Sequence, residues 1–251
     1  MKNATGDPPL LLLEEVASTN DELLQLAAQG AVDGTALAAS RQTAGRGRRG
    51  HSWHSLPGRH VFVSVLHRSR LGAPQLAGLT LDIGVAVAGV IDSLGLSTTL
   101  KWPNDILLGG KKVGGILCEL VDSGAGPSVV IGLGLNVQAV ELPSDLAQAT
   151  TLAAALPDEV ELDRETLTID LVRAIRRACA AYDARGAPDI GAWQARSPSM
   201  GRRVRQVSDR RAGLITGVAA DGALLVHWDG GEGPERFLAG ELEPLAEEAH
   251  R

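Results

Sequence analysis

The sequence predicts an α+β fold, with a large domain over residues 1–197 and a small β-rich domain over residues 198–251. Glycine pairs such as Gly109-Gly110 separate short strand patterns, and two-residue glycine turns favour antiparallel hairpins over alternating βαβ units. After Ser197 the pattern changes to short strands divided by turns, which is typical of a small barrel. A chain of 251 residues is long enough for one large domain and one small one.

Three helices are predicted from capping signals and apolar periodicity. The first spans residues 19–30 and begins at a capping box in which Thr19 is the cap and Glu22 follows three residues later. The second spans residues 74–95, opens on a proline, and has apolar residues at every third or fourth position until a glycine ends it. The third spans residues 163–186, between an aspartate cap and a glycine.

Strands are predicted where apolar and polar residues alternate, or where turn residues bound a short apolar run. A long irregular loop at residues 42–57 separates two of them. The predicted strands of the large domain are Leu10–Glu14, Thr35–Ser40, His60–Leu66, Thr98–Trp102, Asp105–Leu108, Lys111–Val121 and Ser128–Val137. Those of the small domain are Arg203–Val207, Ala212–Val218, Ala223–Trp228 and Glu235–Ala239.

Positive charge is concentrated in one segment of an acidic chain. The formal net charge is −6, yet the segment from Gly34 to Leu81 contains seven arginines and four histidines and neither aspartate nor glutamate. Such a local positive field concentrates small anions. Nucleic-acid binders usually have a broad basic face or aromatic platforms, whereas aromatic residues make up only 3% of this chain. We therefore expect a phosphate or carboxylate ligand and no DNA partner.

Neither a membrane segment nor a metal site is expected. No uninterrupted apolar run approaches the roughly 18 residues of a spanning helix, and the first residues do not resemble a signal peptide. The two cysteines, Cys118 and Cys179, lack the spacing of zinc ligands or of a redox motif, so we interpret them as core thiols. The sequence thus predicts a cytoplasmic protein without protein-bound metal.

The loop after residue 42 contains a glycine-rich motif, Gly45-Arg-Gly-Arg-Arg-Gly50. It matches GxGxxG formally, but a dinucleotide fingerprint opens a helix and is followed about 20 residues later by an acid, which this segment lacks. We interpret it as a glycine hinge whose arginines, Arg46, Arg48 and Arg49, wrap an anion. Because no acid in the loop pairs with these arginines, we expect the loop to be mobile without a ligand.

Lysine is rare in this chain, and its positions are informative. The chain has only four lysines against twenty arginines, and Lys101, Lys111 and Lys112 fall within twelve residues. Strand alternation would place Lys112 with Gly114 on one face, and Lys111 with Gly115 on the other. Glycines inside a strand indicate either a ligand close to the backbone or a β-bulge, and both interpretations remain open.

Taken together, five motifs resemble those of the biotin protein ligases and occur in the family's order. They are Ser18-Thr19-Asn20, Gln42-Thr-Ala-Gly-Arg-Gly-Arg-Arg-Gly50, Lys101-Trp-Pro-Asn-Asp105, Lys112-Val-Gly-Gly-Ile-Leu117 and Gly134-Leu-Asn136. The resemblance implies a catalytic domain similar to class II aminoacyl-tRNA synthetases, with a mixed sheet backed by helices, and a C-terminal SH3-like barrel. It also implies ATP-dependent activation of biotin to biotinyl-5'-AMP, followed by transfer to a lysine of a biotin carboxyl carrier protein.

The resemblance also assigns roles to individual residues. Lys112 and Arg48 would be catalytic, and Asp105 is a candidate to orient or deprotonate the acceptor lysine, with a turn-capping role as the alternative. Mg²⁺ is expected with ATP rather than on protein ligands. The residues that would bind biotin and the nucleotide are Ser18, Thr19, Asn20, Gln42, Gly45, Arg46, Gly47, Arg48, Lys112, Gly115 and Asn136.

Two other functions remain in view: a lipoate-protein ligase, which uses the same two-step logic, and a non-enzymatic biotin-binding regulator. A DNA-bound regulator would need a reading head, and only seventeen residues precede Ser18, so a monofunctional ligase is expected. The intact glycine-arginine and Lys101–Asp105 motifs favour biotin over lipoate. The acceptor's identity and the oligomeric state, a dimer included, are left open.

Overall fold

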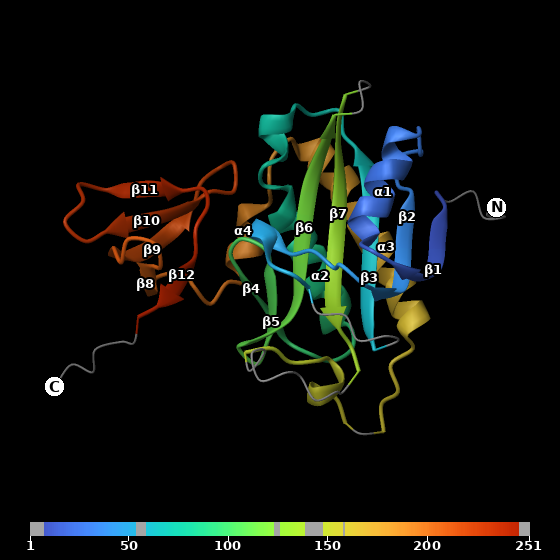
Figure 1. Cartoon of the computed structure of the whole chain (residues 1–251). Coiled ribbons are helices and arrows are strands. Elements are labelled where there is room, and N and C mark those ends of the chain that lie inside the picture. The colour runs from blue at the N-terminus through green and yellow to red at the C-terminus, as the bar shows by residue number, and fades with distance from the viewer. Residues whose placement is uncertain (1–7, 54–58, 123–125, 139–147, 158, 246–251) are drawn as a thin grey trace.

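Two β-sheets carry the fold, one large and mixed and one small and antiparallel (Figure 1). The structure is a computed structural model that describes residues 8–53, 59–122, 126–138, 148–157 and 159–245. The large sheet has the strand order β1-β2-β3-β7-β6-β5-β4, and the small sheet has the order β11-β10-β9-β8-β12.

The elements agree closely with those predicted. The strands of the large sheet are β1 (Leu10–Val16), β2 (Ala36–Gln42), β3 (His60–Arg68), β4 (Thr98–Lys101), β5 (Asp105–Leu108), β6 (Lys111–Asp122) and β7 (Pro127–Asn136). Those of the small sheet are β8 (Arg203–Gln206), β9 (Ala212–Val218), β10 (Leu224–Trp228), β11 (Pro234–Phe237) and β12 (Leu242–Pro244). The helices are α1 (Thr19–Ala28), α2 (Leu79–Asp92), α3 (Arg164–Arg185) and α4 (Ile190–Gln194).

The large sheet is mixed because its first two strands are parallel. β1 and β2 pair in parallel with α1 as the crossover, whereas every other neighbouring pair is antiparallel. The predicted hairpin between β5 and β6 is confirmed. Its turn residues Gly109 and Gly110 have φ values of 58° and 78°, a region that glycine enters without steric cost.

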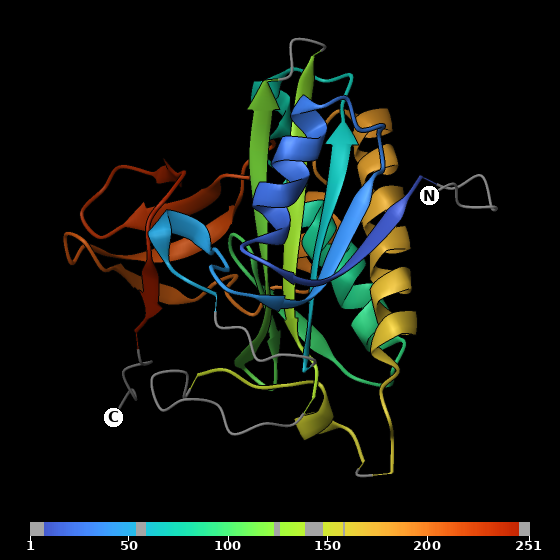
Figure 2. The same cartoon turned by 45° about the vertical axis from the view of Figure 1, so that its right-hand side comes forward.

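Helices cover the two faces of the large sheet unequally. α1 lies on one face, and α2 and α3 pack on the other (Figure 2). The alternation along β7 explains the difference, because Ile131 and Leu133 enter the large core under α2 and α3, while Val130 contacts α1. Gly132 and Gly134 follow Val130 on the α1 face. That face of β7 therefore lacks side chains at these two successive positions.

Two helix predictions need correction at their starts. The cap of α1 is Ser18 rather than Thr19, since the Ser18 Oγ accepts a hydrogen bond from the Asp21 N–H at 3.4 Å. The helix predicted over residues 74–95 is divided into a 3₁₀ turn, Ala73–Leu76, and α2. The division lies at Gly78, where a Cβ would come within 2.7 Å of a proline ring carbon, so the chain needs glycine there.

The caps of α3 are confirmed, with Asp163 at the start and Gly186 in the left-handed conformation at the end. α4 was not predicted, because five residues are too few to show a helical period.

One helical segment of the described chain, Ala73–Asp92, is long and apolar enough to cross a membrane by length and composition alone. Gln75, Thr80, Asp82 and three glycines interrupt its apolar residues, which is why no long continuous run appears in the sequence. In the structure 56% of this segment is buried, and α2 packs against α3 and the large sheet. The burial identifies it as a core helix.

Trp102, from the Lys101–Asp105 motif, connects the small sheet to the large one. Its indole N–H donates to the Gly222 carbonyl at 3.0 Å, and its ring packs on Phe237 with 5.6 Å between ring centroids. Phe237 in turn packs edge to face against Trp228. The segment before β12 is thereby held beside the motif.

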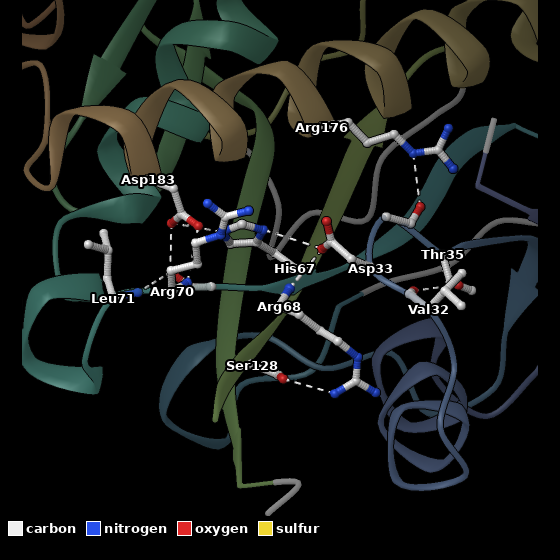
Figure 3. Close-up of polar contacts among 12 residues, drawn as sticks. Val32, Asp33, Thr35, His67, Arg68, Arg70, Leu71, Ser128, Arg176 and Asp183 are labelled. Atoms are coloured by element: carbon white, nitrogen blue, oxygen red, sulfur yellow. Dashed lines mark hydrogen bonds and ion pairs between the residues drawn. The ribbon is translucent and has the colours of Figure 1, made fainter. Parts of the chain in front are cut away.

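A polar cluster fastens β3 to α3 (Figure 3). The His67 ring is buried, with Nε2 at 3.1 Å from an Asp183 oxygen and Nδ1 at 3.5 Å from Asp33. Asp183 also accepts from the Ser69 hydroxyl at 2.6 Å. Burial alone would raise the pKa of Asp183, but the hydrogen bonds from Ser69 and His67 outweigh it and hold that pKa below its usual range.

Asp183→Ala is expected to lower the free energy of unfolding by about 1–3 kcal/mol at neutral pH, because it leaves buried donors without their acceptor. A carboxyl with a lowered pKa stabilises the folded state above its unfolded value of about 3.9, and the contribution is lost as the pH falls through the folded value. The difference between wild type and variant should therefore shrink in acid. Urea unfolding of wild type and variant, at neutral pH and in acid, measures this difference in the free energy of unfolding.

Asp170→Ala serves as the control, since Asp170 is an exposed residue of the same helix, paired with Arg173 at 3.6 Å. An equal loss in both variants, or a loss in Asp183→Ala that does not depend on pH, would contradict the role given to this cluster.

Candidate active site

A cavity of about 280 Å³ opens on the α1 face of the large sheet, where β7 lacks side chains. Its walls come from the start of α1, the loop between β2 and β3, the β5–β6 hairpin and residues 240–242 before and in β12. The loop lies between the two sheets (Figure 2). The predicted site residues that line the cavity are Ser18, Thr19, Asn20, Gln42, Arg46, Gly47, Arg48, Asp105, Lys112 and Gly115.

One end of the cavity is uncharged and densely hydrogen-bonded. The Gln42 Oε1 accepts from the Thr19 N–H at 2.8 Å and from the Thr19 hydroxyl at 3.1 Å. The buried Ser64 hydroxyl lies 2.9 Å from the Thr19 Oγ1 and 2.6 Å from the Asn20 Oδ1. Since β2 and β3 are neighbours and α1 lies over β3, these four side chains meet over the sheet.

Glycines in β7 make room for these side chains. A Cβ at Gly132 would overlap the Asn20 amide, and a Cβ at Gly134 would lie 2.5 Å from the Trp53 ring. The Trp53 ring therefore lies directly over the backbone of β7. Its indole N–H is buried and has no hydrogen-bond partner within the described residues.

The other end of the cavity is cationic. The Lys112 Nζ lies 2.5 Å from an Asp105 oxygen and 5.6 Å from the centroid of the Trp53 ring. Arg48 is half-buried, and its Nη1 lies 3.5 Å from the Asn104 Oδ1. Burial, and then repulsion from Arg49, lower the pKa of Arg48, although a guanidinium remains charged at neutral pH.

The predicted strand alternation at Lys112 is wrong, and a β-bulge is the reason. Ile106 pairs with Gly114 while Leu107 pairs with Lys112, so Val113 is an extra residue in β6. The Lys112 side chain therefore extends over Gly115, where a Cβ would be 3.4 Å from its Nζ. Of the two open interpretations, the β-bulge is confirmed, and the atoms close to Gly115 are those of the Trp53 and Lys112 side chains. A ligand close to this backbone stays a prediction.

The loop between β2 and β3 has more anchors than the sequence predicts. The Gly47 N–H donates to the His51 carbonyl at 2.7 Å, and the Trp53 N–H donates to the Gly45 carbonyl at 2.8 Å. The Arg46 Nη2 pairs with Asp21 at 2.6 Å and with Glu119 at 2.8 Å. The loop itself has no acid, as the sequence shows, but the inference that its arginines lack acidic partners is wrong for Arg46, whose partners come from α1 and β6.

Two of the predicted binding residues lie outside the cavity wall. Gly45 lies next to it, where a Cβ would come within 2.8 Å of the Trp53 carbonyl oxygen. The Asn136 Nδ2 donates to the Thr150 carbonyl at 3.0 Å, and the Thr150 N–H in turn donates to the Lys112 carbonyl. Asn136 thus supports the backbone that carries Lys112.

Sequence reasoning did not assign Ser64, Trp53, Asn104 or Glu119 to the site. Ser64 gave a weak signal, because it is the polar residue in the apolar run from His60 to Leu66. Asn104 fixes the hairpin, since its Nδ2 donates to the Ile116 carbonyl at 2.8 Å. Within the described ranges, no three His, Cys, Asp or Glu side chains converge in a way that could hold a metal ion.

Comparison with known proteins identifies the family. The profile of the Biotin/lipoate A/B protein ligase family matches residues 12–136. The chain is 34% identical over 226 residues to the bifunctional ligase/repressor BirA of Escherichia coli, covering 87% of the chain and 69% of that protein. It is 37% identical over 211 residues to the biotin--[acetyl-CoA-carboxylase] ligase of Mycobacterium tuberculosis. That alignment covers 80% of this chain and 75% of the relative.

The fold agrees with that assignment. A biotin protein ligase from Aquifex aeolicus, solved in complex with biotin and ATP, superposes with a TM-score of 0.78 at 28% identity, covering 94% of this chain and 98% of that one. The family resemblance carried by the five motifs is confirmed by relatives that align over most of the chain. The chain belongs to the biotin protein ligase family.

Proposed function

We propose that this protein is an ATP-dependent biotin protein ligase, which forms biotinyl-5'-AMP and transfers biotin to a lysine of a biotin carboxyl carrier protein. One observation carries the proposal: a single cavity has uncharged hydrogen-bonding groups at one end and fixed cations at the other. A bicyclic ureido head and an activated carboxylate need those two environments at the two ends of one molecule.

The uncharged end suits the biotin head. Thr19, Asn20 and Gln42 supply donors and acceptors in fixed orientations, and the glycines of β7 make room for Asn20 and for the Trp53 ring beside them. The unpaired Trp53 indole N–H would be satisfied by a polar ligand atom in the cavity. Ser18 contributes indirectly, because it caps the helix that carries the other two residues.

The cationic end suits adenylation. In that step the biotin carboxylate attacks the α-phosphorus of ATP, so two anions must approach, and fixed cations lower the electrostatic barrier. Lys112, Arg48 and Arg46 border the cavity for this purpose. Because Lys112 is paired with Asp105, it would exchange this carboxylate for the ligand's oxygens. Mg²⁺ would be held mainly by the ATP phosphates and would neutralise part of their charge.

Asp105 gains a role from this exchange. The acceptor lysine has an unperturbed pKa of about 10.4, so it must lose a proton before it attacks the acyl carbon. Once Lys112 turns to the phosphate, the Asp105 carboxylate is free to orient or deprotonate the incoming amine. Asp105 takes the proton that the ammonium loses, the neutral amine forms a bond to the acyl carbon, and the bond between that carbon and the phosphate oxygen breaks. AMP then leaves, and the second amine proton passes to AMP or to water.

The loop and the small sheet would protect the adenylate. A mixed anhydride is readily hydrolysed, and the cavity wall includes the Arg46–Trp53 loop on one side and residues 240–242 on the other. The same proposal includes a synthetase-like catalytic domain over residues 1–197, an SH3-like barrel over residues 198–251, and a cytoplasmic location without a DNA partner. Gly45 and Asn136 would aid nucleotide binding by shaping the loop and the backbone at Lys112.

Incubation with ATP and labelled biotin tests the proposal. We expect labelled biotinyl-AMP, release of pyrophosphate, and label on the lysine of an added carrier domain. Lipoate in place of biotin should give little adenylate, because the dithiolane ring of lipoate lacks the ureido donors and acceptors. Absence of any acyl-adenylate would refute the ligase function, and a preference for lipoate would reassign it.

A further inference from the structure

A chain of close polar contacts runs from the uncharged end of the cavity to the arginine loop. It passes from Gln42 through Thr19 to Ser64, and then to the Asn20 Oδ1. The other end of the Asn20 amide donates to the Glu119 Oε2 at 2.6 Å. The same carboxylate oxygen accepts from the Arg46 Nη2 at 2.8 Å. Glu119 thus connects the uncharged end of the cavity to Arg46 of the loop.

Glu119 reaches this position from β6. Its neighbour in that strand, Leu117, offers its carbonyl to the Asn20 Nδ2 at 3.3 Å, so Asn20 lies over two successive positions of β6 on the α1 face. The Glu119 side chain is only 24% exposed, and Asn20 is 4% exposed. Their hydrogen bond is therefore largely shielded from water, which strengthens a bond to a charged acceptor.

Glu119 and the Leu117 carbonyl, two acceptors on β6, together fix the orientation of the Asn20 amide. A carboxylate only accepts hydrogen bonds, so the NH₂ group of Asn20 must face it and the Oδ1 must face Ser64. The Ser64 hydroxyl has one proton to share between Asn20 and Thr19, so its direction depends on the same choice. Glu119 is the closer of the two acceptors, so with Leu117 it sets which groups at this end of the cavity donate and which accept.

Glu119 also restrains the loop. Arg46 has two acidic partners, Asp21 at 2.6 Å and Glu119 at 2.8 Å, and the more buried of the two is Glu119. An anionic ligand that recruits Arg46 has to compete with these carboxylates. The clasp formed by Arg46, Asp21 and Glu119 holds the loop near the cavity while the arginine has no ligand.

We propose that Glu119 is a positioning residue of this site, which orients Asn20 for the biotin head and holds Arg46 beside the cavity until the ligand's anion arrives. The inference rests on the proposed function for the identity of the ligand. Its two parts depend on different properties of one side chain. The orientation of Asn20 needs an acceptor, whereas the clasp needs a negative charge.

Two substitutions separate these properties. Glu119→Gln retains an amide oxygen for Asn20 but lacks the charge for Arg46. We expect its KM for biotin to stay within about threefold of wild type, and its ligand-free cleavage by trypsin after Arg46 and Arg48 to be several-fold faster. Glu119→Ala lacks both, so its KM for biotin should rise by about tenfold with a smaller change in kcat, since a lost hydrogen bond is worth about 1.5 kcal/mol.

Glu15→Gln is the matched control, because it removes the charge of a glutamate that pairs with Arg41 at 2.8 Å on an exposed part of β1. It should change neither the KM for biotin nor the cleavage after Arg46. Melting curves of all three variants separate these local effects from a general loss of stability, which would affect the KM of Glu119→Gln and Glu119→Ala alike.

Two results would overturn the proposal: a wild-type KM in Glu119→Ala, or unchanged ligand-free cleavage in Glu119→Gln. The cleavage measurement contains no ligand and no turnover, so it reports on the clasp even if the wild-type chain forms no adenylate. Failure of the clasp and failure of the ligase function are therefore distinguishable.

Discussion

Lys112→Ala is expected to lower the rate of biotinyl-AMP formation by about 10²–10³-fold, the effect of removing one fixed electrostatic contact from a transition state. Lys112 is the lysine at the cationic end of the cavity, extended over Gly115 by the bulge at Val113. In the proposed mechanism its charge meets the oxygens on which negative charge develops, so the loss should appear in kcat for adenylation. Rapid-quench measurement with labelled biotin determines it.

Lys111→Ala is the matched control. Lys111 is exposed, precedes Lys112 directly and does not line the cavity. Its removal changes the net charge equally but should leave the rate within a few-fold of wild type, because an exposed charge is screened by salt. Equal losses in both variants would indicate a long-range field effect, and a normal rate in Lys112→Ala would remove Lys112 from the catalytic group.

The sequence predicts this site well wherever function depends on short motifs. Thr19, Gln42 and Lys112 are far apart in the chain, yet the motifs containing them line one cavity. The start and end of α3 were also predictable, because a capping aspartate and a left-handed glycine act within one helical turn. Motifs and caps of this kind depend only on residues that are close in the sequence, so the sequence alone reveals them.

Features that depend on pairing between distant segments were not predictable. Regular alternation puts Lys112 and Gly115 on opposite faces, and nothing in β6 itself reveals that β5 pairs around Val113. The acidic partners of Arg46 come from α1 and β6, so a search within the loop could not find them. The cap of α1 was not predictable for a different, local reason. Either hydroxyl, of Ser18 or of Thr19, can accept a hydrogen bond from an N–H of the first helical turn, and the backbone dihedral angles decide between them.

Gly132→Ala is expected to weaken biotin binding by about 10–100-fold, because displacing Asn20 costs about one or two hydrogen bonds, including a charged one. A Cβ at Gly132 would occupy the place of the Asn20 amide. Displacing Asn20 breaks hydrogen bonds, since its Nδ2 donates to Glu119 and its Oδ1 accepts from Ser64, each at 2.6 Å. Titration calorimetry with biotin alone measures the loss without any contribution from turnover.

A double-mutant cycle of Gly132→Ala with Asn20→Ala tests whether displacement of Asn20 causes the loss of biotin affinity. Once the Asn20 side chain is removed, a methyl group at Gly132 has no amide to displace, so the double variant should bind biotin about as well as Asn20→Ala alone. Gly89→Ala is the control for glycine replacement, because a Cβ there has no neighbour within 4 Å and alanine favours the helix. Additive losses from Asn20→Ala and Gly132→Ala would mean that the methyl group obstructs the ligand itself. In that case Gly132, rather than the amide lying over it, would form the surface against which biotin packs.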